Sequence, residues 1–516
     1  MSRLEYLSDC IKLSAWYILP LSLIAWQGLI TGIILYVVIM KMVESAIKLL
    51  LNQSFMSYED ERFFAAASHR PGNMPCWGRM ERVNDVDGFR KAIIERCLAF
   101  PRLKSKVQKL LGRHMFVEYS DEELLAEVDS LVLVAHDIHN EQQLREFMLK
   151  ELMTPFPKNG FQFRYTLIPD YTENQSVWVM NQQHGLMDGL AMLFLCSDIS
   201  DTPSLDRYPN VAVRMSWIQS IVTNLVIPFY LTYLLFEKFA LTGPDTNGIK
   251  DQHEVLNKPD AKMELETIRD LDLNEVKRVA KECSTKKVKV TVNDVMMTLL
   301  SKTLNDYLRQ YKNDHQSQKV GVNLPFSMRP APKCVGDWEA NNQFSLIPLN
   351  IPLCDDIKKG MIDISLETTA MKNSLQPIGN AQLLKLVLRL PTFLRQAYMR
   401  YHYRQCTLSY SIVPQPRKAF TFHGSQMNCV GTFSVLQPGL AFTISMVSHA
   451  DCMKVGFAIN TEAVDPKVFK RLYTSNIDEM LGSRDWQKYH EHRNCASQSS
   501  SPRSSEGKST EVTLKE

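Results

Sequence analysis

The sequence lacks the features that mark small metal-binding or disulfide-rich proteins. Its 11 cysteines are scattered from Cys10 to Cys495, and no two of them form a Cys-x-x-Cys pair. Zinc-binding spacings and a compact disulfide framework are therefore absent, and we expect reduced, buried thiols. The 12 histidines show no ligand spacing either, so we predict no metal site.

A strong net charge is also missing. The 59 basic and 56 acidic side chains leave a formal charge of +3, which gives no indication of a nucleic-acid partner. Any anionic ligand would have to be bound by a local basic cluster. With 45% hydrophobic and 22% charged residues over 516 positions, the composition is that of a globular protein with two domains or one two-lobed domain.

Charged residues are absent from two long stretches. The first, Leu13–Met40, contains 28 residues and is bracketed by Lys12 and Lys41. As a helix it would measure ~42 Å, which exceeds the ~30 Å hydrocarbon core, so a tilted or kinked spanning helix would fit. We predict an N-terminal membrane anchor within residues 1–50; a buried core helix is the alternative.

The second uncharged stretch, Met215–Phe236, has 22 residues and contains Pro228. Two full membrane spans would place the segments before and after it on opposite sides of the bilayer, although both look like parts of one globular unit. We therefore predict that Met215–Phe236 is re-entrant, interfacial, or packed on the protein surface facing lipid.

The remaining pattern is that of an α/β protein with two lobes. We expect a first lobe over 51–214, an apolar membrane-associated segment and linker over 215–262, and a second lobe over 263–482. The tail, 483–516, is rich in Ser, Lys and Glu and is expected to be disordered. Predicted helix caps are Asp87, Asn140 and Thr291.

One motif suggests chemistry. Val177–Gly189 begins as an apolar, β-rich run that predicts a strand, breaks at Gly185, and restarts after Gly189 as an apolar helix. His184 is thereby placed at a strand end, with Asp188 and Gly189 in the loop that follows. Strand ends that open into loops are where α/β proteins tend to place catalytic groups. Taken alone, the motif is equally compatible with an ordinary histidine beside an Asp-Gly turn.

Six segments, in the order of the chain, resemble the bifunctional wax ester synthase/acyl-CoA:diacylglycerol acyltransferase family. Gln183–Gly189 is similar to the family's HHxxxDG motif. The other segments are Thr291–Val295, similar to an Asn-Asp helix start; Val322–Pro325 and Asn341–Phe344, similar to the strands that follow it; Ser411–Pro416, similar to SNVPGP; and Thr443–Ala450, similar to an L-T-I-S strand. The likeness extends from about Ser57 to Leu481.

The resemblance implies a two-lobed, chloramphenicol-acetyltransferase-like fold of the CoA-dependent acyltransferases. It further implies transfer of an acyl group from acyl-CoA, as a co-substrate, to a long-chain alcohol or diacylglycerol, without a permanently bound cofactor. His184 would be the general base, because a neutral imidazole can accept the proton of a hydroxyl at physiological pH. Asp188 would hold the loop through a basic partner elsewhere, and Gly189 would keep the backbone clear of the substrate.

The resemblance also suggests where other parts of the substrate bind. Asn293, with Asp294, is a candidate for the oxyanion or the substrate channel, although a helix-capping role for Asn293 is an equal alternative. Lys286, Lys287 and Lys289 form a compact basic cluster near that motif. Because such a run of lysines usually lies on a solvent-exposed surface, we do not assign it to binding the CoA phosphates.

Three departures from the family pattern keep another function open. Gln183 replaces the first histidine of the motif, Gln415 replaces the glycine of SNVPGP, and the family's PLW segment is absent near 160–162. A non-catalytic acyl-CoA- or lipid-binding protein with the same fold is the alternative to the enzyme, and a membrane scaffold is a third hypothesis. The expected location is a membrane, the endoplasmic reticulum, with a cytosolic catalytic face; the oligomeric state is unknown.

Overall fold

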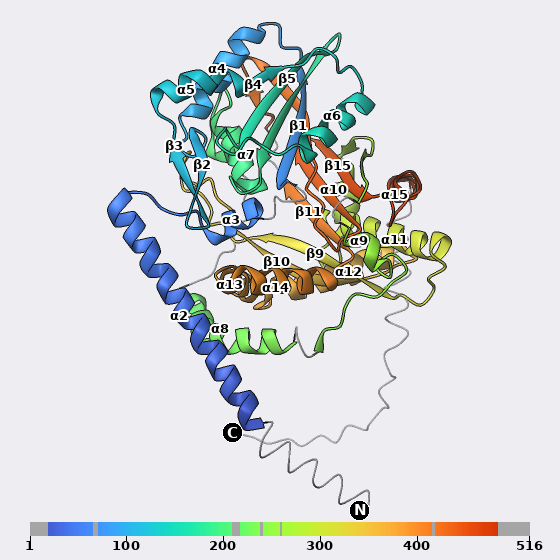
Figure 1. Cartoon of the computed structure of the whole chain (residues 1–516). Coiled ribbons are helices and arrows are strands. Elements are labelled where there is room, and N and C mark those ends of the chain that lie inside the picture. Colours follow the sequence, from blue (N-terminus) through green and yellow to red (C-terminus); the bar gives the residue numbers. More distant parts are fainter. Residues whose placement is uncertain are drawn as a thin grey trace, which may run out of the picture.

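The computed structural model describes residues 19–65, 71–208, 217–237, 241–258, 261–414 and 418–482. Within them the chain forms two mixed β-sheets, each covered by helices, in a two-lobed arrangement (Figure 1). The predicted disordered tail, 483–516, and the start of the predicted anchor, 1–18, lie outside the described residues.

The first sheet has six strands in the order β12-β13-β1-β6-β5-β4. β6 (Gln175–Gln183) lies between β1 and β5, and every residue after its first is buried. Burial on both faces explains why its sequence is a continuous apolar run rather than an alternation. The other strands are β1 (Asn73–Glu81), β4 (Val132–Val134), β5 (Phe163–Thr172), β12 (Thr421–Phe422) and β13 (Ser425–Thr432).

Helices α4 (Val86–Leu98) and α7 (Gly189–Asp198) pack on one face of this sheet, and α6 (Glu141–Met153) packs on the other. Asn140 caps α6, as predicted, but α4 is capped by Asp85 rather than Asp87. Asp87 lies instead in the first turn, where its charge favours the helix N-terminus. The remaining elements of this lobe are α3 (Tyr58–Ala65), α5 (Asp121–Glu127), and a hairpin of β2 (Ser105–Leu110) and β3 (Arg113–Glu118).

The second sheet has seven strands, in the order β10-β9-β11-β14-β15-β7 with β8 paired to β15. One face is covered by four helices, of which α11 begins after Thr291, the predicted cap. The strands are β7 (Met263–Thr267), β8 (Leu271–Asp272), β9 (Lys319–Ser327), β10 (Phe344–Pro352), β11 (Leu408–Pro414), β14 (Phe442–His449) and β15 (Cys452–Asn460). The helices are α10 (Leu273–Cys283), α11 (Val292–Tyr311), α12 (Ile357–Lys372) and α15 (Pro466–Gly482).

The two sheets do not divide the chain at one point. β12 and β13 come from the segment assigned to the second lobe, 263–482, yet β13 pairs with β1 from Cys76↔Thr432 to Met80↔Met427. The chain thus returns to the first sheet before it completes the second with β14 and β15. The expected boundary near residue 262 differs from the structure here, because an apolar strand pattern does not specify which sheet the strand joins.

Helix α2 (Leu19–Leu51) continues beyond the uncharged stretch through Lys41 and Glu44. Glu44 accepts hydrogen bonds from Arg113 Nη1 at 2.6 Å and from the Tyr58 hydroxyl at 3.0 Å. These bonds attach the C-terminal end of α2 to the first lobe, beside α3 and β3.

Among the helices in the described part of the chain, none is both long and apolar enough to cross a bilayer. The prediction of a membrane-spanning helix over Leu13–Met40 is therefore not supported by the described residues, and residues 13–18 lie outside them.

Helix α8 (Trp217–Phe236) packs through Leu234 against Leu383 and Tyr398 of two helices of the second lobe. These helices are α13 (Gln376–Leu388) and α14 (Thr392–Arg404). On its outer side Phe229 is 79% exposed. Packing on the protein surface was one of the three predicted arrangements and is confirmed, whereas contact of the outer side with lipid stays a prediction.

Candidate active site

The turn between β6 and α7 carries the histidine motif. His184 follows the last residue of β6, and Asp188 caps α7 by accepting a hydrogen bond from the Ala191 amide at 2.9 Å. Gly185 is required at the break, because a Cβ there would lie 2.3 Å from the Phe64 ring and 2.8 Å from the Asp60 carbonyl oxygen. The predicted strand, break and helix are all present.

Asp188 binds a buried arginine of the second lobe. Arg329 is 3% exposed, and its Nε and Nη2 donate to the two carboxylate oxygens of Asp188 at 3.1 and 3.0 Å. The Gln343 amide donates to the same carboxylate at 2.9 Å. Asp188 has the basic partner that the sequence analysis expected, and its oxygens are fully committed to the loop and to the second lobe.

The side chain of Asn342 fixes the orientation of the His184 ring. Its Nδ2 donates to the His184 carbonyl oxygen and to Asp60 Oδ1, both at 2.8 Å. Asn342 Oδ1 must therefore accept the hydrogen bond of 3.0 Å that joins it to His184 Nδ1. Nδ1 consequently carries the proton of the neutral ring, and Nε2 keeps the lone pair that a general base needs.

A second layer of side chains holds this arrangement. Asp60 is fully buried, and its second oxygen accepts from Arg102 Nη1 at 3.0 Å. The Phe63 ring stacks on the His184 ring at 4.0 Å with an interplanar angle of 11°. Helix α3, which supplies Asp60 and Phe63, therefore fixes the ring from two directions.

Burial, helped by the nearby Arg62 cation, lowers the pKa of His184 to about 4. The carboxylate of Asp188 and the bond to Asn342 oppose this shift only in part. At pH 7 the imidazole is thus neutral, which is the form that accepts a proton.

His184 lines a cavity of about 990 Å³ between the two sheets. Side chains of both lobes form its wall, and many of them are apolar. Apolar examples are Met74, Leu190, Leu193, Leu324, Phe326 and Phe344. A cavity of this size and lining suits a ligand with a long apolar part.

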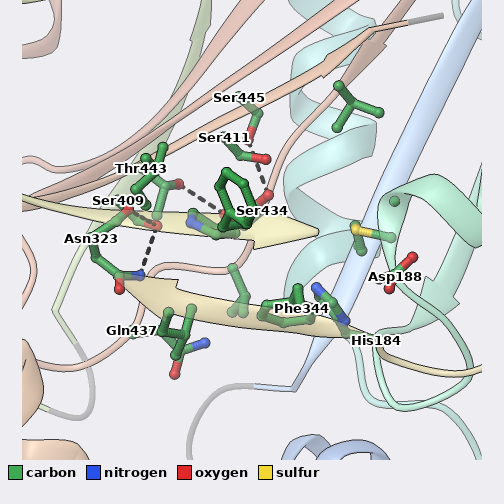
Figure 2. A pocket seen from close by; sticks show the side chains of 18 of the residues that line it. His184, Asp188, Asn323, Phe344, Ser409, Ser411, Ser434, Gln437, Thr443 and Ser445 are labelled. Atoms are coloured by element: carbon green, nitrogen blue, oxygen red, sulfur yellow. Dashed lines mark hydrogen bonds between the residues drawn. The ribbon is translucent and has the colours of Figure 1, made fainter. Parts of the chain in front are cut away.

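Five hydroxyl side chains, here called the hydroxyl cluster, form a polar part of the same wall. Figure 2 shows them gathered across the cavity from His184 and Phe344. Within the cluster one hydroxyl pair lies 3.0 Å apart, and Asn323 Nδ2 donates to another hydroxyl at 3.2 Å. The members are Ser409, Ser411, Ser434, Thr443 and Ser445.

The other predicted site residues differ in position. Asn293 lines the cavity, and it is not the helix cap, because Thr291 occupies that position. Asp294 is buried and does not line the cavity; its carboxylate accepts from the hydroxyls of Thr291 and Thr368 at 2.7 and 2.6 Å. One oxygen thus stabilises the start of α11 and the other binds α12, so the structure gives no support to the candidate channel role of Asp294. Gly189 lines the cavity at the first turn of α7.

Gln183, which stands where the family motif has its first histidine, has a structural position. Its Nε2 donates to the Phe63 carbonyl oxygen at 2.8 Å, and its side-chain oxygen accepts from the Gly185 amide. The side chain thus joins α3 to the histidine loop. Gln415, the other departure, lies outside the described residues.

Sequence reasoning missed three groups of the site. Asp60, Arg329 and Asn342 were assigned no role, although Asn342 lies in a segment that resembles the family. Their separation from His184 or Asp188 along the chain is more than 100 residues, so spacing could not reveal them.

In the described part of the chain, three potential metal ligands meet at one point. Atoms of Asp270, Cys429 and Cys452 lie within 4.8 Å of one another. Asp270 is already paired with Arg79 and, at 2.8 Å, with Lys454. Two cations beside the carboxylate disfavour a metal ion there, and the absence of a metal site stays a prediction.

The Cys429–Cys452 pair predicts a pH-dependent thiol reactivity. The Cys452 thiol donates to Cys429 Sγ at 2.9 Å, and this bond, with Arg79 and Lys454, lowers the pKa of Cys429. Cys452→Val should therefore raise the midpoint of Cys429 alkylation by about one pH unit. Pulse labelling followed by peptide mass spectrometry would measure it. The exposed Cys334 should be unaffected, and an unchanged midpoint at Cys429 would contradict the assigned cause.

Comparison with known proteins identifies the fold first. The wax ester synthase/diacylglycerol acyltransferase from Marinobacter aquaeolei VT8 superposes with a TM-score of 0.56 at 14% identity, covering 83% of this chain and 100% of that one. The first condensation domain of the calcium-dependent antibiotic synthetase gives a TM-score of 0.57 at 11% identity, covering 84% and 96%. The molecule therefore has the two-lobed α/β fold that these acyltransferases and condensation domains share.

Sequence comparison then supports the family resemblance. A family model described as the WS/DGAT C-terminal domain matches residues 340–481. Wax ester synthase/diacylglycerol acyltransferase 2 of Arabidopsis thaliana is 23% identical over 337 residues, which cover 57% of this chain and 66% of that protein, just under two thirds of its length. The predicted resemblance to the wax ester synthase/diacylglycerol acyltransferase family is confirmed.

Proposed function

We propose that this protein transfers an acyl group from acyl-CoA to the hydroxyl of a long-chain alcohol or of diacylglycerol, forming a wax ester or triacylglycerol. The observation that carries the proposal is the state of His184. Its Nδ1 is committed to Asn342, its ring is neutral at pH 7, and it lines a large cavity. The family resemblance supports the choice of donor and acceptor.

The reaction needs one base and no covalent enzyme intermediate. Nε2 of His184 takes the proton of the acceptor hydroxyl while its oxygen attacks the thioester carbonyl carbon. The tetrahedral intermediate collapses, the carbon–sulfur bond breaks, and the CoA thiolate takes the proton from Nε2 to leave as free thiol. A lowered imidazole pKa favours this second transfer, because a thiol has a pKa near ~8.5. Asn293, on the cavity wall, is the candidate donor to the oxyanion.

Membrane association is part of the proposal. The outer side of α8 exposes Leu225 and Phe229, and Phe393 of the neighbouring α14 is 68% exposed. Exposed aromatic and aliphatic side chains of this kind bind the interface of a bilayer. We propose that this surface lies on the membrane of the endoplasmic reticulum, on its cytosolic side, where the acyl acceptors partition.

The pH dependence of the reaction provides a prediction. Because the pKa of His184 is lowered to about 4, the base form persists as the pH falls below neutrality. We expect kcat/KM to stay constant from pH 8 down to about pH 5 and to fall below that, whereas an unperturbed histidine would lose activity near ~6.5. Initial rates in a constant-ionic-strength buffer series would measure the profile. A midpoint near 6.5 would contradict the burial argument.

Product analysis tests the function itself. The purified protein in detergent would be given labelled acyl-CoA with either a fatty alcohol or diacylglycerol, and the lipids would be separated by chromatography. Ester formation with at least one acceptor supports the proposal. Binding of acyl-CoA without ester from any acceptor would instead indicate the non-catalytic lipid-binding protein.

A further inference from the structure

Arg62, on α3, is a half-buried cation, and two of its guanidinium nitrogens have no hydrogen-bond partner among the described residues. Its Nε and Nη1 are shielded from solvent, and neither has a hydrogen-bond acceptor among the described residues. The guanidinium lies over the rings of Phe63 and Phe344, at 4.5 and 4.7 Å from their centroids. Burying unpaired donors of a charged group is unfavourable, so this side chain is arranged for a ligand that supplies the missing acceptors.

Three further cations line the same cavity. Arg395 and Arg400 lie on α14, and Lys372 is the last residue of α12. Lys372 and Arg400 are exposed, whereas Arg62 and Arg395 are half-buried. Among the described residues, none of the four forms an ion pair with a carboxylate.

The wall of this cavity contains almost no acidic side chains. Asp188 is the acidic residue among the cavity's described lining, and Arg329 already neutralises it. Helix α14 contains no Asp or Glu. Four cations thus line the cavity together with one carboxylate that is already paired, although Glu59 and Asp60 of α3 also interact with Arg62. A cavity with this excess of positive charge attracts and binds an anion.

The cations on α14 lie along a row that leads away from the candidate base. Tyr403, which lines the cavity and interacts electrostatically with Arg62, is three residues after Arg400 and eight after Arg395. At ~1.5 Å per residue, the row from Tyr403 to Arg395 is ~12 Å long. Phe63 stacks on His184 and also contacts Arg62, so the row starts beside the candidate base and leads to the exposed cations.

We propose that Arg62, Lys372, Arg395 and Arg400 form the channel for the CoA half of the thioester, with the outer three binding its phosphates and Arg62 donating to the pantetheine arm. This inference rests on the proposed function. A phosphate group takes two parallel hydrogen bonds from an arginine, which favours this residue over lysine at such a site. The cluster of Lys286, Lys287 and Lys289 does not line the cavity.

A binding experiment without turnover tests the channel. Isothermal titration of the full chain with CoA and with pantetheine, which lacks phosphates, would be compared for wild type and the double variant Arg395→Gln/Arg400→Gln. We expect CoA to bind about 10–100-fold more weakly to the variant, since two charge-assisted contacts are lost. Pantetheine binding should be unchanged, and the CoA affinity of the wild type should fall with added salt. Arg62→Gln should weaken both ligands.

The matched control removes lysines near the motif but away from the cavity. The triple variant Lys286→Gln/Lys287→Gln/Lys289→Gln should bind CoA as wild type does. An equal loss in this control would overturn the proposal, as would a double variant that keeps its CoA affinity. A double variant that binds CoA normally but no longer binds vesicles of anionic phospholipid would assign the cations to a lipid headgroup instead.

The outcomes also separate the channel from the enzyme. CoA binding that depends on Arg395 and Arg400 without any ester formation would leave the channel intact and remove the proposed function. Ester formation with the same KM for acyl-CoA in wild type and in the double variant would support the proposed function and remove the proposed channel. Circular dichroism of each variant would establish that the fold is retained.

Discussion

Replacing His184 with alanine should lower the rate of ester formation by ~10²–10⁴-fold, the usual contribution of a positioned general base. The loss should fall on kcat rather than on KM for acyl-CoA, because the imidazole acts on the hydroxyl proton and not on the CoA half. Steady-state rates with a fatty alcohol or diacylglycerol, over a range of acyl-CoA concentrations, would measure both constants.

A matched control is available on the surface. His136 is exposed and contacts Asp170 at 3.0 Å, remote in sequence from the motif. His136→Ala should retain full activity. If His184→Ala kept more than a tenth of the wild-type rate, His184 would not be the base, and the neutral ring beside Asn342 would be only a packing element.

Replacing Arg329 with methionine should destabilise the protein by roughly 3–5 kcal/mol, because the buried carboxylate of Asp188 would be left without its cation. The change should also lower activity, since Asp188 and the Gln343 amide hold the histidine loop against the second lobe. Denaturant unfolding, followed by circular dichroism, would measure the free energy of unfolding.

An exposed ion pair provides the comparison. Arg269 and Asp478 are joined at 2.7 Å, but their side chains are 51% and 60% exposed. Solvent-exposed pairs contribute about 0–1 kcal/mol, so Arg269→Met should have little effect. A similar small effect at Arg329 would show that the Asp188 pair is not required for the fold. In the double variant Asp188→Asn/Arg329→Met, part of the stability should return, because no unpaired charge is then buried.

The local structure around the motif could be predicted because its causes are local. The caps at Asn140 and Thr291 are bonds to amides three residues away, and the sequence shows both partners. The sequence was a poorer guide where a residue of a recognisable motif has a different structural role in the fold. Asp294 stands in a motif that resembles the family, yet its carboxylate binds Thr291 and Thr368 and does not line the cavity.

The sequence by itself determined the strand, the break and the helix that present His184, since burial and hydrogen bonding within a few residues dictate them. Only the tertiary structure decided which nitrogen of the ring carries the proton, because Asn342 lies 158 residues from His184 and Asp60 lies 282 residues from Asn342. The same holds for Arg329, 141 residues from Asp188, and for the position of Arg62 on the cavity wall. Charge and hydrogen bonding act over a few ångströms of space, and a linear sequence does not record that distance.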